Sequence, residues 1–428
     1  MIPGALSRWR IVATTRFWLI VGMVIRLLHV LSLGNRYYFG DTVEYEQAAL
    51  RILHGIHLTG SDPRAPAYPW LFAISFWVGG EQNFLVAKIV QLALALLQMW
   101  LVVHLARRLG GPAAAAVAAP IAALGPTLVF IAGLLYPTLL YSTVLLALTA
   151  VAWELSERPS LRYGVLFGVL MVVGWLTDMI IVAPVLGIGI WLLVALRRQR
   201  APLLRALAVS AITTFVLALP YLALVHREGK ARVFLSKAQA VLYSARSDSV
   251  LAQDRWIRFP PGPIAPPLPM HAFVAREMGL FLSRPVAFLH DYLFELLHFF
   301  KPIADRVTSQ NRFNTLPVLL VGAAWFVGLL SLSLVGLIAG AAPLRGRLLL
   351  ATVVMSTAMF YAFFFTQARY RIPIEPQLVV LAALGIAKAF PRVTGQLAEA
   401  AAEVRLHDRR WPAQPQAAAP AASTNRLS

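Results

Sequence analysis

Long hydrophobic runs separated by short polar clusters make up most of this 428-residue chain. A helix needs about 20 mostly apolar residues to cross a bilayer, because its backbone amides must all bond within the segment. Several runs reach this length, so the pattern predicts an all-α integral membrane protein with about ten spans. We expect these spans near residues 17–34, 83–106, 112–127, 128–153, 162–178, 179–196, 204–225, 315–341, 348–365 and 372–390.

Basic clusters between the runs indicate how the chain is oriented. A cytoplasmic N-terminus would place them all on the cytoplasmic side, as the positive-inside rule requires; they are Arg107-Arg108, Arg158 with Arg162, Arg197-Arg198 with Arg200, and Arg345 with Arg347. An odd number of spans would scatter them, so we expect both termini inside. Residues 1–16 then form a cytoplasmic N-terminus, 17–390 the transmembrane domain, and 391–428 a cytoplasmic tail. Its Ala-, Pro- and Gln-rich composition predicts that the tail is largely disordered, beyond about Arg410.

Two longer segments, at about residues 35–82 and 226–314, fall outside the membrane. The first contains a helical pattern after Asp41 and a short apolar stretch, Tyr68 to Val78, that suits an interfacial or re-entrant helix. The second ends in residues 284–300, whose mixture of bulky apolar and polar residues predicts a helix lying on the membrane surface.

The composition agrees with a membrane protein. Hydrophobic residues make up 59% of the chain and charged residues 13%, whereas soluble domains are about a quarter charged. The net charge of +19 comes from short clusters between apolar runs, so no nucleic-acid partner is expected. With no cysteine, the chain has neither disulfides nor thiolate metal sites. The first apolar run contains Arg26 and no evident cleavage site, which favours an uncleaved span over a signal peptide.

Acidic residues are rare, so those near the membrane face are informative. Asp41 and Glu44 follow the first span, and helical spacing puts Asp41 on one face with Glu44 or Tyr45. A carboxylate beside low-dielectric surroundings is a candidate base for an acceptor hydroxyl. The alternative is that Asp41 only caps the helix that starts at Thr42 or Val43.

Arginines placed where the positive-inside rule does not require them are candidate phosphate ligands. Arg64 lies in a proline-rich run after Asp62, and Arg369, Tyr370 and Arg371 lie at the outer end of the last span. Guanidinium groups at headgroup level could hold a lipid-linked phosphate. The alternatives are a solvated interfacial Arg64 and arginines that extend to lipid headgroups.

Other ionisable residues give weaker signals. Arg26 lies at membrane depth, where it could pair with a carboxylate or help to hold a donor phosphate. We expect Asp178 in a short outer turn with a mainly structural role. His54 and His57 share a helix face, but no carboxylate stands at metal-ligand spacing, so we assign no metal site. The sequence contains no Walker motif, GxGxxG or nucleophile elbow.

Two motifs resemble one family. Gly40-Asp41 with Tyr45, followed by Arg64-x-Pro66-x-Tyr68-Pro69, resembles the first external loop of GT-C-type membrane glycosyltransferases. More narrowly, it is similar to the bacterial branch related to protein O-mannosyltransferases and the lipid A aminoarabinose transferase. Ala368 to Pro373 with Pro376 resembles the element with which that branch begins its last span.

The resemblance implies a GT-C fold and an inverting transfer of a sugar from a polyprenyl-phosphate carrier to a glycan, lipid or protein acceptor. It places the chain in the bacterial inner (plasma) membrane, acting in cell-envelope biogenesis. Asp41 would be the base, with Glu44 as the second catalytic candidate. The remaining candidates would bind substrate: Tyr45, Arg64, Tyr68, Arg369, Tyr370, Arg371 and Arg26.

One departure from the family concerns an acid early in the fourth span. Members often have a glutamate in a pattern like Leu-Leu-Ser-Glu-Thr-Leu, where this chain has Leu134 to Leu139 with Tyr136 and Pro137. Either Asp41 works without it, or Glu44 supplies the second acid, or the substrates bind differently. The missing acid also weakens the case for a divalent metal, which some relatives use, so no cofactor is certain.

Two other function classes remain open at this point. A transporter or flippase of lipid-linked intermediates would need repeats, broken helices and ionisable residues inside the spans, and few are evident. A non-catalytic membrane scaffold would need no base at all. Replacing Asp41 would separate a scaffold from an enzyme.

Overall fold

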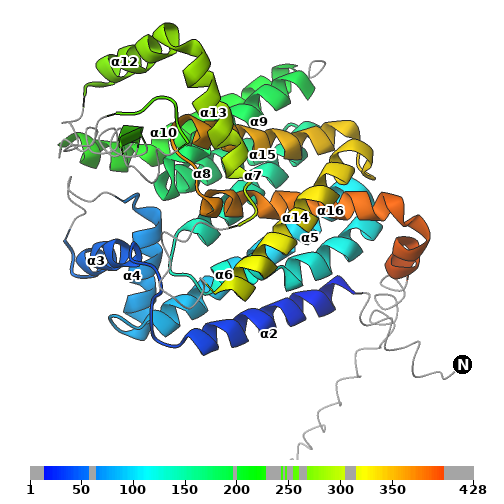
Figure 1. Ribbon diagram of the computed structural model, residues 1–428. Coiled ribbons are helices and arrows are strands. Elements are labelled where there is room, and N and C mark those ends of the chain that lie inside the picture. The colour runs from blue at the N-terminus through cyan, green and yellow to red at the C-terminus, as the bar shows by residue number, and fades with distance from the viewer. Residues whose placement is uncertain are drawn as a thin grey trace, which may run out of the picture.

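The computed structural model describes residues 14–56, 64–195, 200–227, 242–243, 246–247, 254–259, 268–303 and 315–399, and these form helices and no strands (Figure 1). The N-terminal part of the chain contributes α2 (Thr15–Leu33), α3 (Thr42–Leu53), α4 (Ala67–Gly79), α5 (Phe84–Leu124), α6 (Pro126–Ala132) and α7 (Thr138–Glu157). The middle contributes α8 (Leu161–Thr177), η1 (Met179–Ile181), α9 (Val182–Ala195) and α10 (Arg200–Arg227). The C-terminal part contributes α12 (Met270–Ser283), α13 (Pro285–Phe299), α14 (Leu316–Ala339), α15 (Leu344–Phe364), η2 (Ala368–Ile374) and α16 (Glu375–Ala389).

The prediction of an all-helical membrane protein is confirmed. Within the described ranges, 7 helices are long and apolar enough to cross a membrane: α2, α5, α7, α10, α14, α15 and the continuous stretch of η2 and α16. Leu161–Thr177 and Met179–Ala195 are shorter apolar helices that match two further predicted spans. Helix α5 contains two predicted spans, because Gly111 has a positive φ of 77° that turns the chain inside it.

The predicted fourth span, 128–153, is wrong as a single helix. α6 ends at Ala132, and residues 133–137 are not helical before α7 begins at Thr138. Pro137 lacks a backbone N–H and disfavours helix in the residue before it, which explains the break. The interruption places Tyr136 and Pro137 in a loop at one end of the bundle.

The core of the bundle is formed by α7 and by η2 with α16. In their apolar 18-residue stretches, 83% and 78% of the residues are buried. α2 and α10 are peripheral, at 22% and 11%, and expose their apolar side chains as lipid-facing helices do. α14 and α16 approach closely at Gly336 and Gly385, where a Cβ on Gly336 would lie 1.8 Å from the Leu381 carbonyl oxygen. Small residues let membrane helices pack backbone to backbone in this way.

Four cations, three of them buried and Arg347 partly buried, bond to carbonyl oxygens at the C-terminal ends of helices. Arg26 donates to Ala122 and Ala123 at the end of α5, both at 2.9 Å. Lys88 bonds to carbonyls just after α2, Arg347 to the last turn of α14, and Arg371 to residues that follow α13. Helix C-termini have unpaired carbonyls and partial negative charge, so these helix-capping cations satisfy them.

The helices α3 and α4 lie at one end of the bundle, while α2 begins at the other end, beside helical residues 391–399 (Figure 1). The predicted cytoplasmic tail therefore begins with a helix, and its part beyond about Arg410, for which we predicted disorder, lies outside the described residues. The rest of that tail, the N-terminal residues 1–13, Asp62 and the proline-rich part of the second long loop lie outside the described residues.

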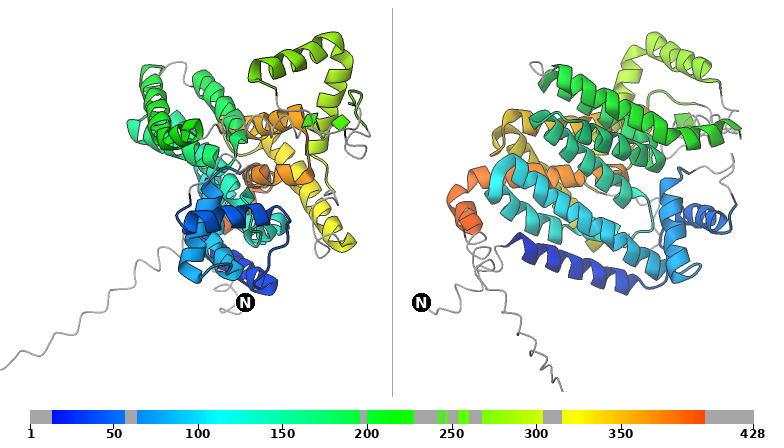
Figure 2. Two further views of the ribbon diagram at one scale, coloured as in Figure 1. Left: turned by 90° about the vertical axis from the view of Figure 1, so that its left-hand side faces the viewer. Right: turned by 180° about the vertical axis from the view of Figure 1, so that it is seen from behind.

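α12 and α13 project from one corner of the bundle (Figure 2). The predicted helix at 284–300 is present as α13, with an inverted polarity in which Asp291 and Glu295 are buried. An apolar stripe on its outer side is exposed, with Val286 71% exposed and Leu297 75% exposed, whereas Phe299 is buried. An outward apolar stripe of this kind suits contact with lipid acyl chains.

Candidate functional site

A cavity of about 310 Å³ opens where the first long segment, residues 35–82, meets the ends of α7, α8 and α15. This volume is within the range of small-molecule sites. Its walls come from five separated parts of the chain; they are Tyr45, Arg64, Ala65, Tyr136, Pro137, Thr138, Tyr141, Thr177, Asp178, Met179, Ile180, Phe360, Tyr361, Phe364, Phe365, Arg369, Tyr370 and Pro373. The walls thus combine residues from both motifs that the sequence singled out.

Asp41 contacts three residues of this cavity. Its Oδ2 atom lies 3.4 Å from an Arg64 nitrogen, 3.6 Å from an Arg369 nitrogen and 3.4 Å from the Tyr136 hydroxyl, which donates to it. The side chain remains 37% exposed. The two sequence motifs therefore meet at one carboxylate.

The interpretation of Asp41 as a helix cap is wrong. It precedes α3, but its backbone has helical φ and ψ of −61° and −21°, and its side chain makes no capping hydrogen bond. A capping side chain needs an extended backbone at this position to reach the next amides. The Asp41 carboxylate points to the arginines instead.

Arg64 is fixed by a second carboxylate and by an aromatic ring. Its Nε donates to Glu44 Oε2 at 2.6 Å, and its guanidinium lies 4.9 Å from the centre of the Tyr45 ring. Burial alone would lower the pKa of Arg64, but Tyr45, Tyr136 and Glu44 raise it above its ordinary value. Arg64 therefore keeps its positive charge at the edge of the cavity.

Tyrosine rings line the cavity around these charges. The Tyr45 and Tyr136 rings meet edge to face at 5.6 Å, and Arg369 lies 5.9 Å from the Tyr136 ring. Burial raises the pKa of Tyr136 to about 12, so its hydroxyl is a hydrogen-bond donor at neutral pH. Tyr361 and Tyr370 stack at 4.7 Å. Tyr136 lies in the stretch where members of the resembled family often have an acid, and we did not predict it as a site residue.

Two further polar residues line the cavity from other elements. Asp178, which we expected to be mainly structural, accepts a hydrogen bond from the Ile180 amide at 3.1 Å and also lines the cavity. Tyr141, on α7, was not a sequence candidate. The one sequence signal for it is Pro137, which breaks the helix just before α7 and could have indicated that the first turn of α7 lies at a site.

Three predicted substrate ligands do not line this cavity. Arg26 caps α5, and the Tyr68 hydroxyl is buried and donates to Gln91 at 2.9 Å. Arg371 lies 3.8 Å from the centre of the Phe326 ring and donates to the carbonyls of Lys301 and Pro302. In the tight η2 turn, neighbouring side chains point in different directions, so Arg369 and Tyr370 face the cavity and Arg371 does not.

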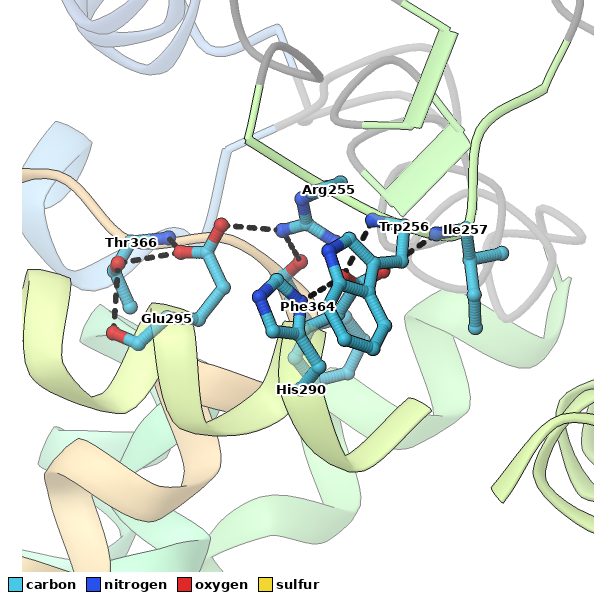
Figure 3. Close-up of polar contacts among 8 residues, drawn as sticks. Arg255, Trp256, Ile257, His290, Glu295, Phe364 and Thr366 are labelled. Atoms are coloured by element: carbon cyan, nitrogen blue, oxygen red, sulfur yellow. Dashed lines mark hydrogen bonds and ion pairs between the residues drawn. The ribbon is translucent and has the colours of Figure 1, made fainter. Parts of the chain in front are cut away.

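A short part of the second long loop, residues 254–259, is attached beside the cavity, and we call it the strap. Arg255 donates to Glu295 of α13 at 2.6 Å and to the Phe364 carbonyl at 3.0 Å (Figure 3). Glu295 in turn accepts from the Thr366 amide at 2.7 Å. The buried ion pair therefore joins α13 to the segment that carries the cavity residues Phe364 and Phe365.

The strap has a second attachment to α13. Asp291 accepts from the backbone amides of Trp256 and Ile257 at 2.8 and 2.9 Å, and the Trp256 and His290 rings stack at 3.8 Å (Figure 3). Each carboxylate of α13 thus has a defined partner, which explains why these polar residues face inward.

Within the described residues, no group of three His, Asp or Glu side chains could hold a metal ion. The two carboxylates nearest the arginines, Asp41 and Glu44, are both ion-paired with Arg64. A carboxylate pair neutralised by guanidinium groups does not match the oxygen-ligand set of a divalent metal.

Comparison with solved structures identifies the fold. ArnT from Cupriavidus metallidurans, bound to undecaprenyl phosphate, matches with a TM-score of 0.56 and 17% identity over 91% of this chain. The apo oligosaccharyltransferase of Archaeoglobus fulgidus matches with a TM-score of 0.56 and 16% identity over 92% of this chain. The chain spans 63% of ArnT and 54% of the oligosaccharyltransferase. No protein-family model and no curated protein sequence matches.

Proposed function

From its GT-C fold, shared with ArnT and the archaeal oligosaccharyltransferase, we propose that this integral membrane protein is a glycosyltransferase. It moves a sugar from a polyprenyl-phosphate donor to an acceptor on the external face and inverts the anomeric carbon. The acceptor is a glycan, a lipid or a protein. The proposed location is the bacterial inner membrane, with both termini in the cytoplasm.

The observation that carries this proposal is the position of Asp41 between Arg64 and Arg369, at an aromatic cavity. When a hydroxyl attacks a carbon that is bonded to phosphate, a base takes the proton of the hydroxyl and cations stabilise the departing phosphate. Asp41 and the two arginines have these two properties. Guanidinium groups bind phosphate oxygens in pairs of hydrogen bonds, and their charge stabilises a phosphate that departs. ArnT was crystallised with undecaprenyl phosphate, which has this chemistry.

The reaction is one displacement. Asp41 accepts the proton of an acceptor hydroxyl while that oxygen forms a bond to the anomeric carbon. The bond from this carbon to the phosphate oxygen breaks, and its electron pair leaves with the lipid phosphate, beside Arg64 and Arg369. Attack opposite the leaving group inverts the configuration. The proposed mechanism has no step through a metal.

The buried cations favour this function over transport. A transporter needs ionisable residues that line a path near the membrane midplane. Arg26 and Lys88 lie within the spans, but they bond to helix-end carbonyls. Asp41 and Glu44 pair with Arg64 at the edge of the cavity, not at membrane depth.

The test is sugar transfer by purified protein from a panel of radiolabelled polyprenyl-phosphate sugars. Loss of a general base lowers turnover by roughly 10²- to 10⁴-fold, so Asp41→Asn should retain its fold and lose transfer. Glu81→Gln is the matched control, because Glu81 is exposed and pairs with His54 away from the cavity. Wild-type protein that binds no donor and consumes none would refute the proposed function.

A further inference from the structure

Asp178 brings a carboxylate into the cavity from the turn between α8 and η1. Of the described residues that line the cavity, it is the one acid, since Asp41 and Glu44 stand at the edge. Its neighbours in the wall include Thr177, on the same turn, and Thr138 and Tyr141 at the start of α7. This part of the wall is therefore rich in hydrogen-bonding groups.

Tyr141 supplies an independent indication of a ligand. Its side chain is 2% exposed, and its hydroxyl has no hydrogen-bond partner in the described structure. A buried hydroxyl without a partner costs free energy, so such a group in a cavity wall indicates a polar group that binds there. The carboxylate of Asp178 can accept hydrogen bonds from a ligand, and the hydroxyl of Tyr141 can donate one to it.

The charges of Arg64, Arg369 and Asp178 determine which part of a lipid-phosphate sugar lies next to Asp178 and Tyr141. A lipid phosphate is drawn to Arg64 and Arg369 and repelled by the carboxylate of Asp178. The sugar is bonded to that phosphate, so it extends from the arginines into the remaining space of the cavity. The aromatic residues Tyr361 and Tyr370 enclose this space.

We propose that Asp178 and Tyr141 form the sugar subsite of the enzyme, a conclusion that rests on the proposed function. Asp178 accepts a hydrogen bond from a hydroxyl or ammonium group of the transferred sugar, and Tyr141 donates one to a sugar oxygen. The subsite selects neutral or amino sugars and excludes sugars with a carboxylate. It also supplies the second carboxylate of the site, which the sequence lacks near Pro137.

The test compares donors that differ by one hydroxyl. Wild type, Asp178→Asn and Tyr141→Phe are assayed with the polyprenyl-phosphate sugar that wild type consumes and with its monodeoxy analogues. Asn can still accept the bond from the Ile180 amide, so the η1 turn is retained. Asp178→Asn should lower kcat/KM about 10- to 100-fold for the parent sugar, as the loss of a charged hydrogen bond does. For the analogue that lacks the contacted hydroxyl, the variant and wild type should agree within about twofold.

Control measurements separate this subsite from the other parts of the site. Binding of undecaprenyl phosphate, which has no sugar, should be equal in wild type and in both variants. Glu81→Gln and Tyr292→Phe are the matched controls, because both side chains lie outside the cavity.

Two outcomes would overturn the sugar subsite while sugar transfer by wild type is intact. One is an unchanged kcat/KM in Asp178→Asn, and the other is an equal loss for the parent sugar and every deoxy analogue, which marks a purely structural role. Wild type that binds undecaprenyl phosphate but consumes no sugar donor would instead refute the proposed function, and the subsite with it.

Discussion

Arg64 and Arg369 come from opposite ends of the chain and contact the same carboxylate. Arg369 also has a buried Nε without a hydrogen-bond partner in the described structure, which suits a phosphate oxygen. The two arginines are therefore the residues whose loss should affect the donor phosphate directly.

We predict that Arg369→Ala weakens binding of undecaprenyl phosphate by roughly 10- to 100-fold, the value of a charged hydrogen bond. Arg369→Lys should recover only part of this loss, because an ammonium group lacks the planar fork. Fluorescence or calorimetric titration in detergent measures the affinity, with Arg392→Ala as the control. Equal affinities of Arg369→Ala and wild type would exclude Arg369 as a phosphate ligand.

Arg26 gives the opposite prediction. Arg26→Met removes bonds to the carbonyls at the end of α5 and should destabilise the fold by about 3 kcal/mol, while the KM for the donor stays unchanged. Thermal unfolding in detergent and steady-state kinetics measure the two effects separately. A higher KM at an unchanged Tm would show that Arg26 binds the donor after all.

The sequence made Asp41, Arg64 and Arg369 separate candidates, because their residue types were unusual for their positions. Only the family resemblance joined them, with Tyr370, into one predicted site. The sequence did not distinguish Arg371 from Arg369, since the difference depends on the direction of side chains in the η2 turn. It also missed Tyr141, because one tyrosine in an apolar helix has no signal until a cavity is seen beside it.

At the scale of elements, the strap connects the second long loop to the cavity wall. The ion pair between Arg255 and Glu295 is buried, with side chains 3% and 2% exposed. Removing one partner leaves a buried charge unpaired, which costs about 3–5 kcal/mol, whereas an apolar replacement of both partners costs less.

We therefore predict that Arg255→Met and Glu295→Met each destabilise the protein more than the double variant does. The single variants should also become sensitive to proteases within residues 254–259, because the strap loses its attachment. Unfolding and limited proteolysis of all four proteins complete a double-mutant cycle. Additive losses would show that the two side chains do not depend on each other.

Most helices were predictable from hydrophobic length, because each span must satisfy its backbone within the bilayer. The boundary between α6 and α7 could not be predicted in this way, because the apolar run continues across it. The proline that breaks the helix is also at the cavity wall, so the misplaced boundary hid the site residues beside it. The strap could not be predicted, as its contacts depend on carboxylates of a distant helix.

At the scale of the whole molecule, the ends of the described chain lie together, opposite α3 and α4 (Figure 1). In the proposed orientation, the side of the molecule where both ends of the described chain lie faces the cytoplasm, and the cavity faces the outside. Because the chain has no cysteine, single cysteines report this directly. We predict that Glu81→Cys reacts with a membrane-impermeant maleimide in intact cells and that Arg392→Cys reacts only after permeabilisation. The reverse pattern would invert the topology.

Under the proposed function, the ion pairs of Asp41 with Arg64 and Arg369 compete with substrate binding in the resting state. The carboxylate occupies the cations that the donor phosphate needs, and the cations hold the carboxylate that the acceptor needs. Binding of the donor phosphate to the two arginines would release the carboxylate of Asp41, so the base would become available only when a donor is present. Under the proposed function we therefore expect ordered binding, with donor first and acceptor second, because an acceptor that arrives alone would meet a base that is already ion-paired.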